Sequence, residues 1–100
     1  MREIILQNGG ANATGEGYAH SSPRVTLSAT GNFSDGTKLY FETHTGDGDW
    51  HRIHDRDHNE IELKDECVNA VIEWLPCGFP IRAKIVGGDE NTDVTVLMVS

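Results

Sequence analysis

Hydrophobic and polar residues alternate along several short stretches of this chain, and such alternation predicts β-strands with one buried face. In residues 38–44, Leu39 and Phe41 share one face of the strand, and polar side chains share the other. We therefore predict strands at residues 2–7, 24–29, 38–44, 50–54, 81–86 and 93–99, and a core that includes Val25, Leu27, Leu39, Phe41, Ile53, Ile81, Ala83, Ile85, Val94 and Val96.

Polar segments rich in glycine and aspartate separate these strands, and both residue types tolerate the positive φ angles of tight turns. We expect HTGDGD (44–49) to join the strands on either side of it into a hairpin, and GGDEN (87–91) to join the last two strands into another. The last strand contains the run VTVLMV (94–99), which is apolar on both faces, so we expect it to be central or covered.

The segment LKDECVNAVIEWLPCG (63–78) fits two patterns. Its apolar residues recur at helical spacing, and its closing proline and glycine would end such a helix. Alternatively, Val71–Leu75 forms a strand that pairs with Ile81–Val86 across the PCGF turn. The adjacent β-branched residues of this segment and the β structure on either side favour the strand.

About seven to eight short antiparallel strands, with a turn about every 8 to 12 residues, predict an all-β fold of the immunoglobulin-like β-sandwich type. We expect residues 1–100 to form this single domain. The segment Asn8–Ser22 (NGGANATGEGYAHSS) contains four glycines and few residues that could enter a core. We expect an extended loop or arm there, which in a structural protein reaches across to a neighbour.

Composition and charge narrow the range of partners. With 37% hydrophobic and 24% charged residues, the chain has the composition of a globular domain. Its formal net charge of −8 argues against nucleic acid and against an anionic membrane as partners. The first apolar run, Ile4–Leu6, is too short for a signal-peptide core. Cys67 and Cys77 form no CxxC motif, so we expect two free, partly buried thiols.

The stretch HTGDGDWHRIHDRDH (44–58) carries four of the five histidines and four aspartates. A zinc site would use His44, His51, His54 and His58 as ligands. No HExxH motif is present, and on a strand His51 and His54 would point to opposite faces. These patterns argue against zinc and favour the tip of a solvated hairpin.

Calcium is the second metal alternative. Asp55, Asp57, Asn59 and Glu66 stand at positions 1, 3, 5 and 12 of an EF-hand-like loop, but Glu60 stands where that loop needs glycine. No nucleophile elbow, phosphate-binding loop or paired-carboxylate frame accompanies the cluster. We therefore predict no enzymatic activity, no catalytic residue, and no metal or other cofactor, with the calcium loop kept as a weak alternative.

Residues 42–66 hold nine acidic residues against three basic ones. Such a charge excess forms either a solvated face or a patch that meets a basic partner surface. Trp50 and Trp74 raise the further possibility of sugar binding through aromatic stacking. Because the chain has only 7% aromatic residues, we expect both tryptophans to pack in the core instead.

Residues 31–99 resemble small structural proteins of tailed-bacteriophage virions. In that pattern a glycine-rich turn leads to a strand, a short Asp-Gly turn and a Trp, and later to a Leu-Pro-Gly turn, an Arg-containing strand and a Gly-Gly turn. The chain carries these elements as Gly36, Leu39, Phe41, Asp47, Gly48, Trp50, Leu75, Pro76, Gly78, Arg82, Gly87 and Gly88. The histidine-rich loop departs from the usual Ser/Gly turn.

The resemblance implies a β-sandwich that acts as a capsid decoration or cement protein and binds the major capsid protein. It implies a location on the virion, most directly the capsid surface, after assembly in the host cytoplasm, where the cysteines would stay reduced. Self-association into trimers is compatible with this role, although no residue specifies it. The alternative function is a carbohydrate- or receptor-binding module of a tail or fibre. The sequence does not assign the partner-binding residues.

Overall fold

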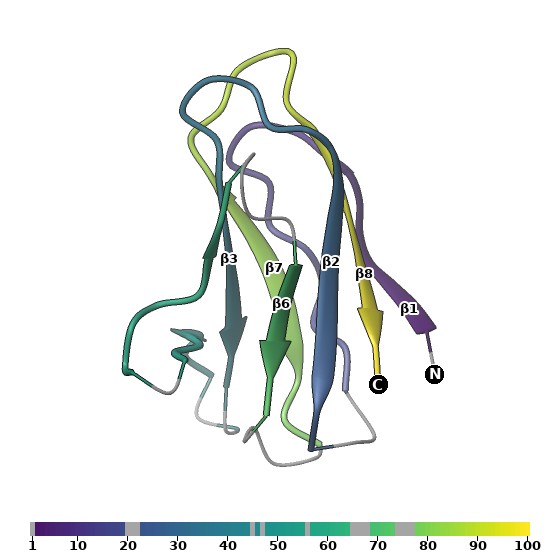
Figure 1. Cartoon of the computed structure of the whole chain (residues 1–100), viewed down its shortest axis with the longest axis vertical. Helices are drawn as coiled ribbons and strands as arrows, with labels where there is room; N and C mark the ends of the chain where they lie inside the picture. The colour runs from purple at the N-terminus through teal and green to yellow at the C-terminus, as the bar shows by residue number, and fades with distance from the viewer. Residues whose placement is uncertain are drawn as a thin grey trace.

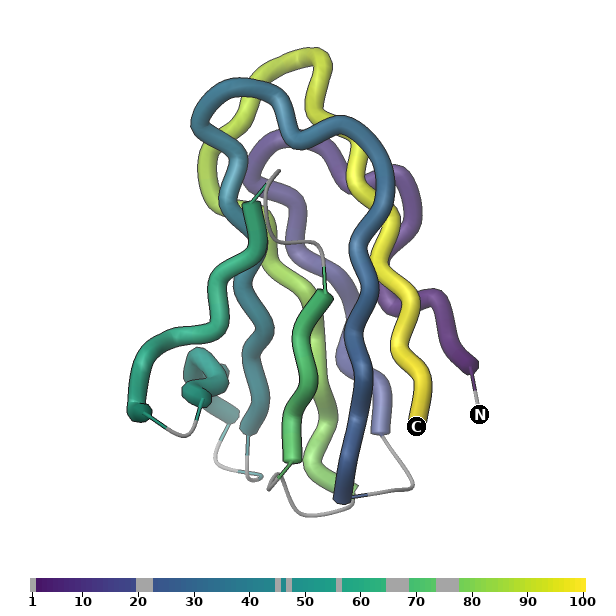
Figure 2. Tube along the Cα trace, viewed as in Figure 1, coloured from purple at the N-terminus to yellow at the C-terminus, as the bar shows by residue number. Residues whose placement is uncertain are grey.

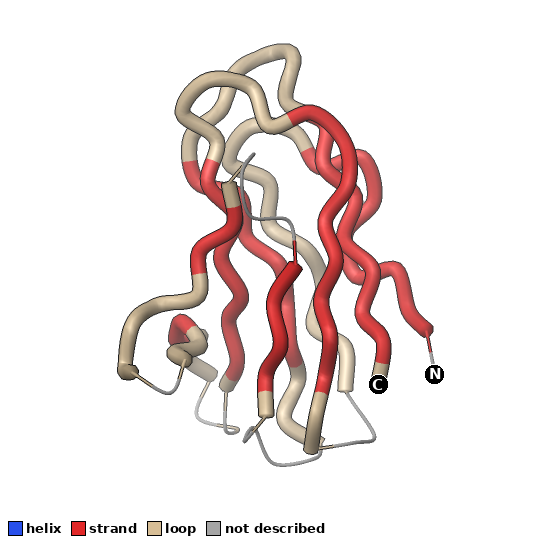
Figure 3. Tube along the Cα trace, viewed as in Figure 1, coloured by secondary structure: helices blue, strands red, loops and turns tan. Residues whose placement is uncertain are grey.

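The computed structural model describes residues 2–19, 23–44, 46, 48–55, 57–64, 69–73 and 78–100. Within these residues the chain is all β, with antiparallel strands in two sheets and no helix (Figures 1 and 3). The strands are β1 (Arg2–Gly9), β2 (Val25–Asn32), β3 (Lys38–Thr43), β4 (His51–Arg52), β5 (Glu62–Leu63), β6 (Asn69–Ile72), β7 (Ile81–Val86) and β8 (Asp93–Val99).

The first sheet has the strand order β1-β8-β2-β6. Strand β8 lies inside it and pairs with β1 on one side and with β2 on the other. Val94, Val96 and Met98 are buried on its core side, and the residues between them are half-buried. The expectation that this doubly apolar strand is central is therefore confirmed.

The second sheet is built around β3. Strand β7 pairs with β3 along its whole length, from Lys38↔Val86 to Thr43↔Ile81. Strands β4 and β5 pair with β3 as well, and the partner of Thr43 in β4 is His51. The predicted hairpin across residues 44–49 is confirmed, and Gly46 and Gly48 adopt the positive φ angles that its turn needs.

One hydrophobic core takes side chains from both sheets, and all ten residues predicted for it are buried. In Figure 1, β6 of the first sheet lies in front of β7 of the second. Phe41 at the centre of β3 is fully buried. The core also takes residues that the sequence did not single out, which are Ile5, Leu6, Ala29, Leu63, Ile72 and Met98.

The predicted hairpin between the last two strands is wrong. Strand β7 pairs with β3, whereas β8 pairs with β1 and β2, so the turn after Val86 carries the chain from one sheet to the other. Complementary charges on the outer face favour the observed partner, because Arg82 of β7 stands directly opposite Glu42 of β3.

The ambiguous segment forms a strand rather than a helix at residues 69–72. Its predicted partner is wrong, because β6 pairs with β2, with Ile72 opposite Val25. This pairing buries Ile72 against the core. The predictions for residues 65–68 and 74–77, which include both cysteines and Trp74, lie outside the described residues.

Strand β1 extends to Gly9, so the predicted loop begins later than expected. Residues 10–19 lie along β7 of the same chain, where Gly15 N donates to Ala83 O and Tyr18 N donates to Ile81 O. Gly15 permits this close packing, since a Cβ there would lie 3.3 Å from the Ala83 carbonyl oxygen on β7 and 2.8 Å from the Ile5 carbonyl oxygen on β1. The free edge of β7 thus gains backbone partners within its own chain.

Two turns meet at one end of the molecule, at the top of Figure 2. Thr92 lies after β7 and contacts the hydroxyls of Ser34 and Thr37, which lie between β2 and β3. Its Oγ1 also accepts a hydrogen bond from the backbone N–H of Asp89. These hydroxyl contacts join the segment that crosses between the sheets to the β2–β3 turn.

Candidate functional site

The outer face of the second sheet, turned away from the core, carries a group of charged and aromatic side chains. Because alternate residues of β3 enter the core, Tyr40 and Glu42 point outward. The strand register sets Arg52 of β4 and Arg82 of β7 opposite Glu42, one on each side. We call this group the charged face, and it comprises Tyr40, Glu42, Trp50, Arg52, Glu60, Glu62 and Arg82.

Glu42, Arg82 and Trp50 form one unit of the charged face. Arg82 Nε donates to Glu42 Oε1 over 2.7 Å, and the guanidinium carbon lies 4.1 Å from the centre of the Trp50 ring. The side chains of Arg82 and Glu42 are only 21% and 11% exposed. Because the two side chains have little contact with water, the Coulomb attraction between them is screened less than in an exposed pair.

Trp50 is half-buried on this outer face, so the expectation that it packs in the core is wrong. Its ring meets the His44 ring edge to face, with 4.5 Å between the ring centres. It also reaches the backbone of Gly17, where a Cβ would lie 2.7 Å from the ring. Trp50 is therefore held in place by neighbours from three segments of the chain.

Tyr40, Arg52 and Glu60 form a second unit. The guanidinium carbon of Arg52 lies 3.8 Å from the centre of the Tyr40 ring, and its Nη1 donates to Glu60 Oε1 over 3.0 Å. Burial and the carboxylate of Glu62, which accepts a hydrogen bond from the Tyr40 hydroxyl, raise the pKa of Tyr40. The hydrogen bond to Glu60 raises the pKa of Arg52.

Glu62 connects the second unit to two lysines. Lys64 Nζ lies 3.3 Å and Lys38 Nζ 4.0 Å from Glu62 Oε1. Burial alone would raise the pKa of Glu62, but the two lysines and the Tyr40 hydroxyl together lower it. The acidic excess predicted for residues 42–66 is thus partly neutralised by bases from β3, β4 and β7.

The four histidines considered as zinc ligands do not converge on one point. Among the described residues, no group of three or more His, Cys, Asp and Glu side chains is placed to hold a metal ion. The His44 ring contacts the Trp50 ring. The backbone of His51 pairs with that of Thr43 on β3, and the backbone of His54 forms an isolated β-bridge with that of Glu60.

Asp55, the first residue of the candidate calcium loop, has a local structural role. Asp55 Oδ1 accepts hydrogen bonds from Asp57 N and Asn59 N, over 2.9 and 3.1 Å, which form a tight turn. Glu66, the fourth candidate ligand, lies outside the described residues. The calcium alternative therefore stays a prediction.

Arg82 and Tyr40 were not predicted as site residues. The signal that could have found them is the placement of opposite charges at outward positions of strands that pair in register. Reading that signal requires the pairing of β3 with β7, which local alternation does not give.

Comparison with protein-family profiles, with curated protein sequences and with solved structures finds no match. Across the described part of the chain, no helix has the length and apolar character needed to cross a membrane.

Proposed function

We propose that this protein is a non-enzymatic structural protein of a tailed-bacteriophage virion, a capsid decoration or cement protein that binds the major capsid protein and stabilises the shell. The fold we assign to it is the immunoglobulin-like β-sandwich. The shared core of the two antiparallel sheets supports this assignment. The sequence resemblance over residues 31–99 supports the virion role.

The charged face is the observation that carries the proposal. Arg, Trp and Tyr are the residues that contribute most often to the energetic centre of protein interfaces. Here Arg52, Arg82 and Trp50 are held in set positions by ion pairs and ring contacts. Docking such side chains costs less conformational entropy than docking mobile ones. The face therefore suits binding to a fixed, repeated surface such as a capsid shell.

A carbohydrate- or receptor-binding module of a tail or fibre is the second candidate, and the partial exposure of Trp50 favours it. The Arg82 guanidinium already lies over the Trp50 ring, which argues against a sugar stacking on that face of the ring. Tryptophan fluorescence of the wild type and of Trp50→Ala, titrated with a glycan panel, separates the two candidates. A saturable change lost in the variant would favour the sugar-binding module.

The test of the proposed function is to mix the purified protein with undecorated capsid particles and measure the copies bound per shell. We expect a copy number that follows the number of capsid subunits, and a clear loss of binding in Trp50→Ala and Arg52→Ala. Val71→Ala is the matched control, because Val71 is exposed on the opposite sheet. No binding, or equal binding by all variants, would contradict the proposal.

A further inference from the structure

Strand β1 lies at the edge of the first sheet, and no strand of the described residues pairs with its side away from β8. Strand β8 pairs with one side of it, and the backbone hydrogen bonds of the described residues include none to the other side. An open edge offers a row of N–H and C=O groups to an incoming strand. The same strand also carries Ile4, which is 48% exposed and one of only two large hydrophobic residues so exposed in the described chain.

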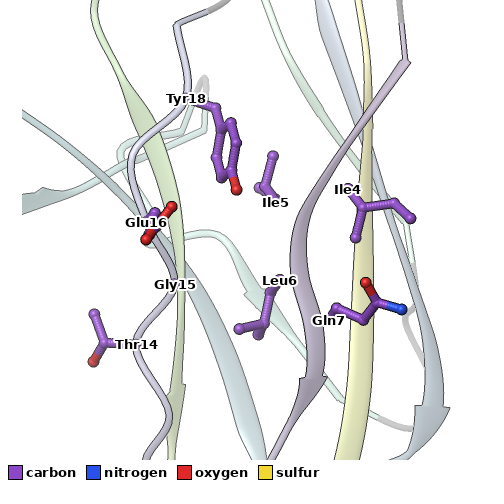
Figure 4. Close-up of a pocket in the computed structure, with 8 residues that line it drawn as sticks. All are labelled: Ile4, Ile5, Leu6, Gln7, Thr14, Gly15, Glu16 and Tyr18. Carbon is purple, nitrogen blue, oxygen red and sulfur yellow. The ribbon is translucent and has the colours of Figure 1, made fainter.

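A groove of about 260 Å³ runs between β1 and residues 14–18 (Figure 4). Ile5 and Leu6 point from β1 toward this segment, whereas Ile4 points away from it. Tyr18 forms part of the opposite wall. The groove is large enough for one or two aliphatic side chains. A strand added at β1 would therefore have apolar contacts in the groove on one face and with Ile4 on the other.

One wall of the groove is β1 of the first sheet, and the other is the segment of residues 14–18, which lies on β7 of the second sheet. Residues 13–18 use their backbone toward β7, where Ile85 N donates to Ala13 O and Gly15 N donates to Ala83 O. The walls approach each other at Gly15, whose Cβ position would lie 2.8 Å from the Ile5 carbonyl oxygen. An incoming segment therefore lies along the outer edge of β1 and inserts only side chains into the groove.

Charge decides what kind of segment fits. Among the described residues that line the groove, Glu16 is the only charged one, and Glu3 lies beside Ile4 on β1. Arg2 is the one base on this strand. With a formal net charge of −8, a second copy of this chain would be repelled, whereas a basic segment would be attracted.

We propose that the edge of β1 and its groove bind an extended, basic segment of a partner protein by β-strand addition. The backbone of the segment pairs with β1, one aliphatic side chain enters the groove, and Lys or Arg side chains lie near Glu16 and Glu3. This site is separate from the charged face and does not depend on the virion role.

The test uses a fluorescein-labelled peptide of sequence Lys-Val-Lys-Val-Lys-Val-Lys and the full chain. We expect saturable binding that weakens as salt is added, and about tenfold weaker binding in Ile4→Ser and in Glu16→Lys. The matched controls are Val71→Ser, which changes the other exposed apolar residue, and Glu90→Lys, which makes the same change in net charge. Both controls should bind like the wild type.

Two peptide controls and one spectrum separate strand addition from simple charge attraction. A peptide with backbone N-methyl groups and the same side chains should lose binding, as should Glu-Val-Glu-Val-Glu-Val-Glu. In the ¹⁵N–¹H spectrum, shifts on adding the basic peptide should concentrate at residues 3–7 and 14–18. Equal weakening by Glu90→Lys, shifts centred on the charged face, or no saturation would overturn the proposal, and so would a dimer of the free chain that Ile4→Ser dissociates.

Discussion

Single residues matter most to this fold where the backbone leaves no room for a side chain, or where two opposite charges face each other. Gly31 of β2 has a φ of 120°, and a Cβ there would overlap the carbonyl oxygen of Asp93 on β8. Gly36 also has a positive φ, of 81°, but nothing lies within 4 Å of its Cβ position. A substitution at Gly31 therefore tests backbone strain and a steric clash together, whereas a substitution at Gly36 tests backbone strain alone.

We predict that Gly31→Ala lowers the free energy of unfolding by about 3 kcal/mol or more, because strain and clash add. Gly36→Ala should cost only about 1 kcal/mol, from backbone strain alone. Urea unfolding followed by circular dichroism measures both values. Equal losses in the two variants would show that β2 and β8 do not approach each other as described.

The Glu42–Arg82 pair gives a second prediction at this scale. Glu42→Gln keeps the shape of the side chain but removes the charge that Arg82 faces. We expect a loss of about 1–3 kcal/mol in the free energy of unfolding, since this hydrogen bond joins two charged groups with little access to water. The exposed Glu90→Gln is the control and should change stability by less than about 0.5 kcal/mol. A loss no larger than that of the control would contradict the pairing.

The lowered pKa of Glu62 predicts how stability depends on pH. A carboxyl group whose pKa is lower in the folded state stabilises the fold above its unfolded value, here 4.5, and loses that contribution as the pH falls through the folded value. We therefore expect the free energy of unfolding to fall below about pH 4.5. The fall should be shallower in Glu62→Gln than in Glu90→Gln, and parallel curves for the two variants would refute the role of Glu62.

Among the strands, alternation predicted the buried positions, but of the strand pairs it gave the β3–β4 hairpin and missed the partners of β6, β7 and β8. The apolar face of a strand, such as the face of β3 that carries Leu39 and Phe41, is buried whichever strands lie beside it. All ten predicted core residues are therefore buried. Alternation in β7 is equally compatible with β3 and β8 as partners, because either pairing buries the same side chains. For this reason the predicted β7–β8 hairpin was wrong. Without the pairing of β3 with β7, the sequence could not predict the charged face.

Thr92 tests the link between the crossing segment and the β2–β3 turn. Thr92→Val removes a hydroxyl that contacts Ser34 and Thr37 and accepts from Asp89 N. Because these partners are part-buried or buried, we expect a loss of about 1–3 kcal/mol in the free energy of unfolding. The exposed Thr30→Val on β2 is the control and should stay within about 0.5 kcal/mol of the wild type. If both variants match the wild type, the hydroxyl cluster does not hold the two turns together.

At the scale of the whole molecule, two sheets enclose one core and leave two different surfaces. The charged face lies on the second sheet, and the free edge of β1 belongs to the first. The sequence predicted the acidic excess of residues 42–66 but not its pairing with Lys38 and Arg82, because these two bases lie outside that segment and reach it only through the pairing of the strands. The sequence predicted an extended loop or arm at Asn8–Ser22. It could not predict that residues 10–19 pack along β7, because that packing depends on contacts between residues distant in sequence.

Cryo-electron microscopy of capsid shells mixed with the purified protein tests the proposed capsid role. We expect ordered density for the protein at repeated positions on the shell. We also expect the charged face, with Trp50, Arg52 and Arg82, to lie against the major capsid protein. Shells without added density, or density in which this face points to solvent, would show that the protein does not decorate the shell in this way.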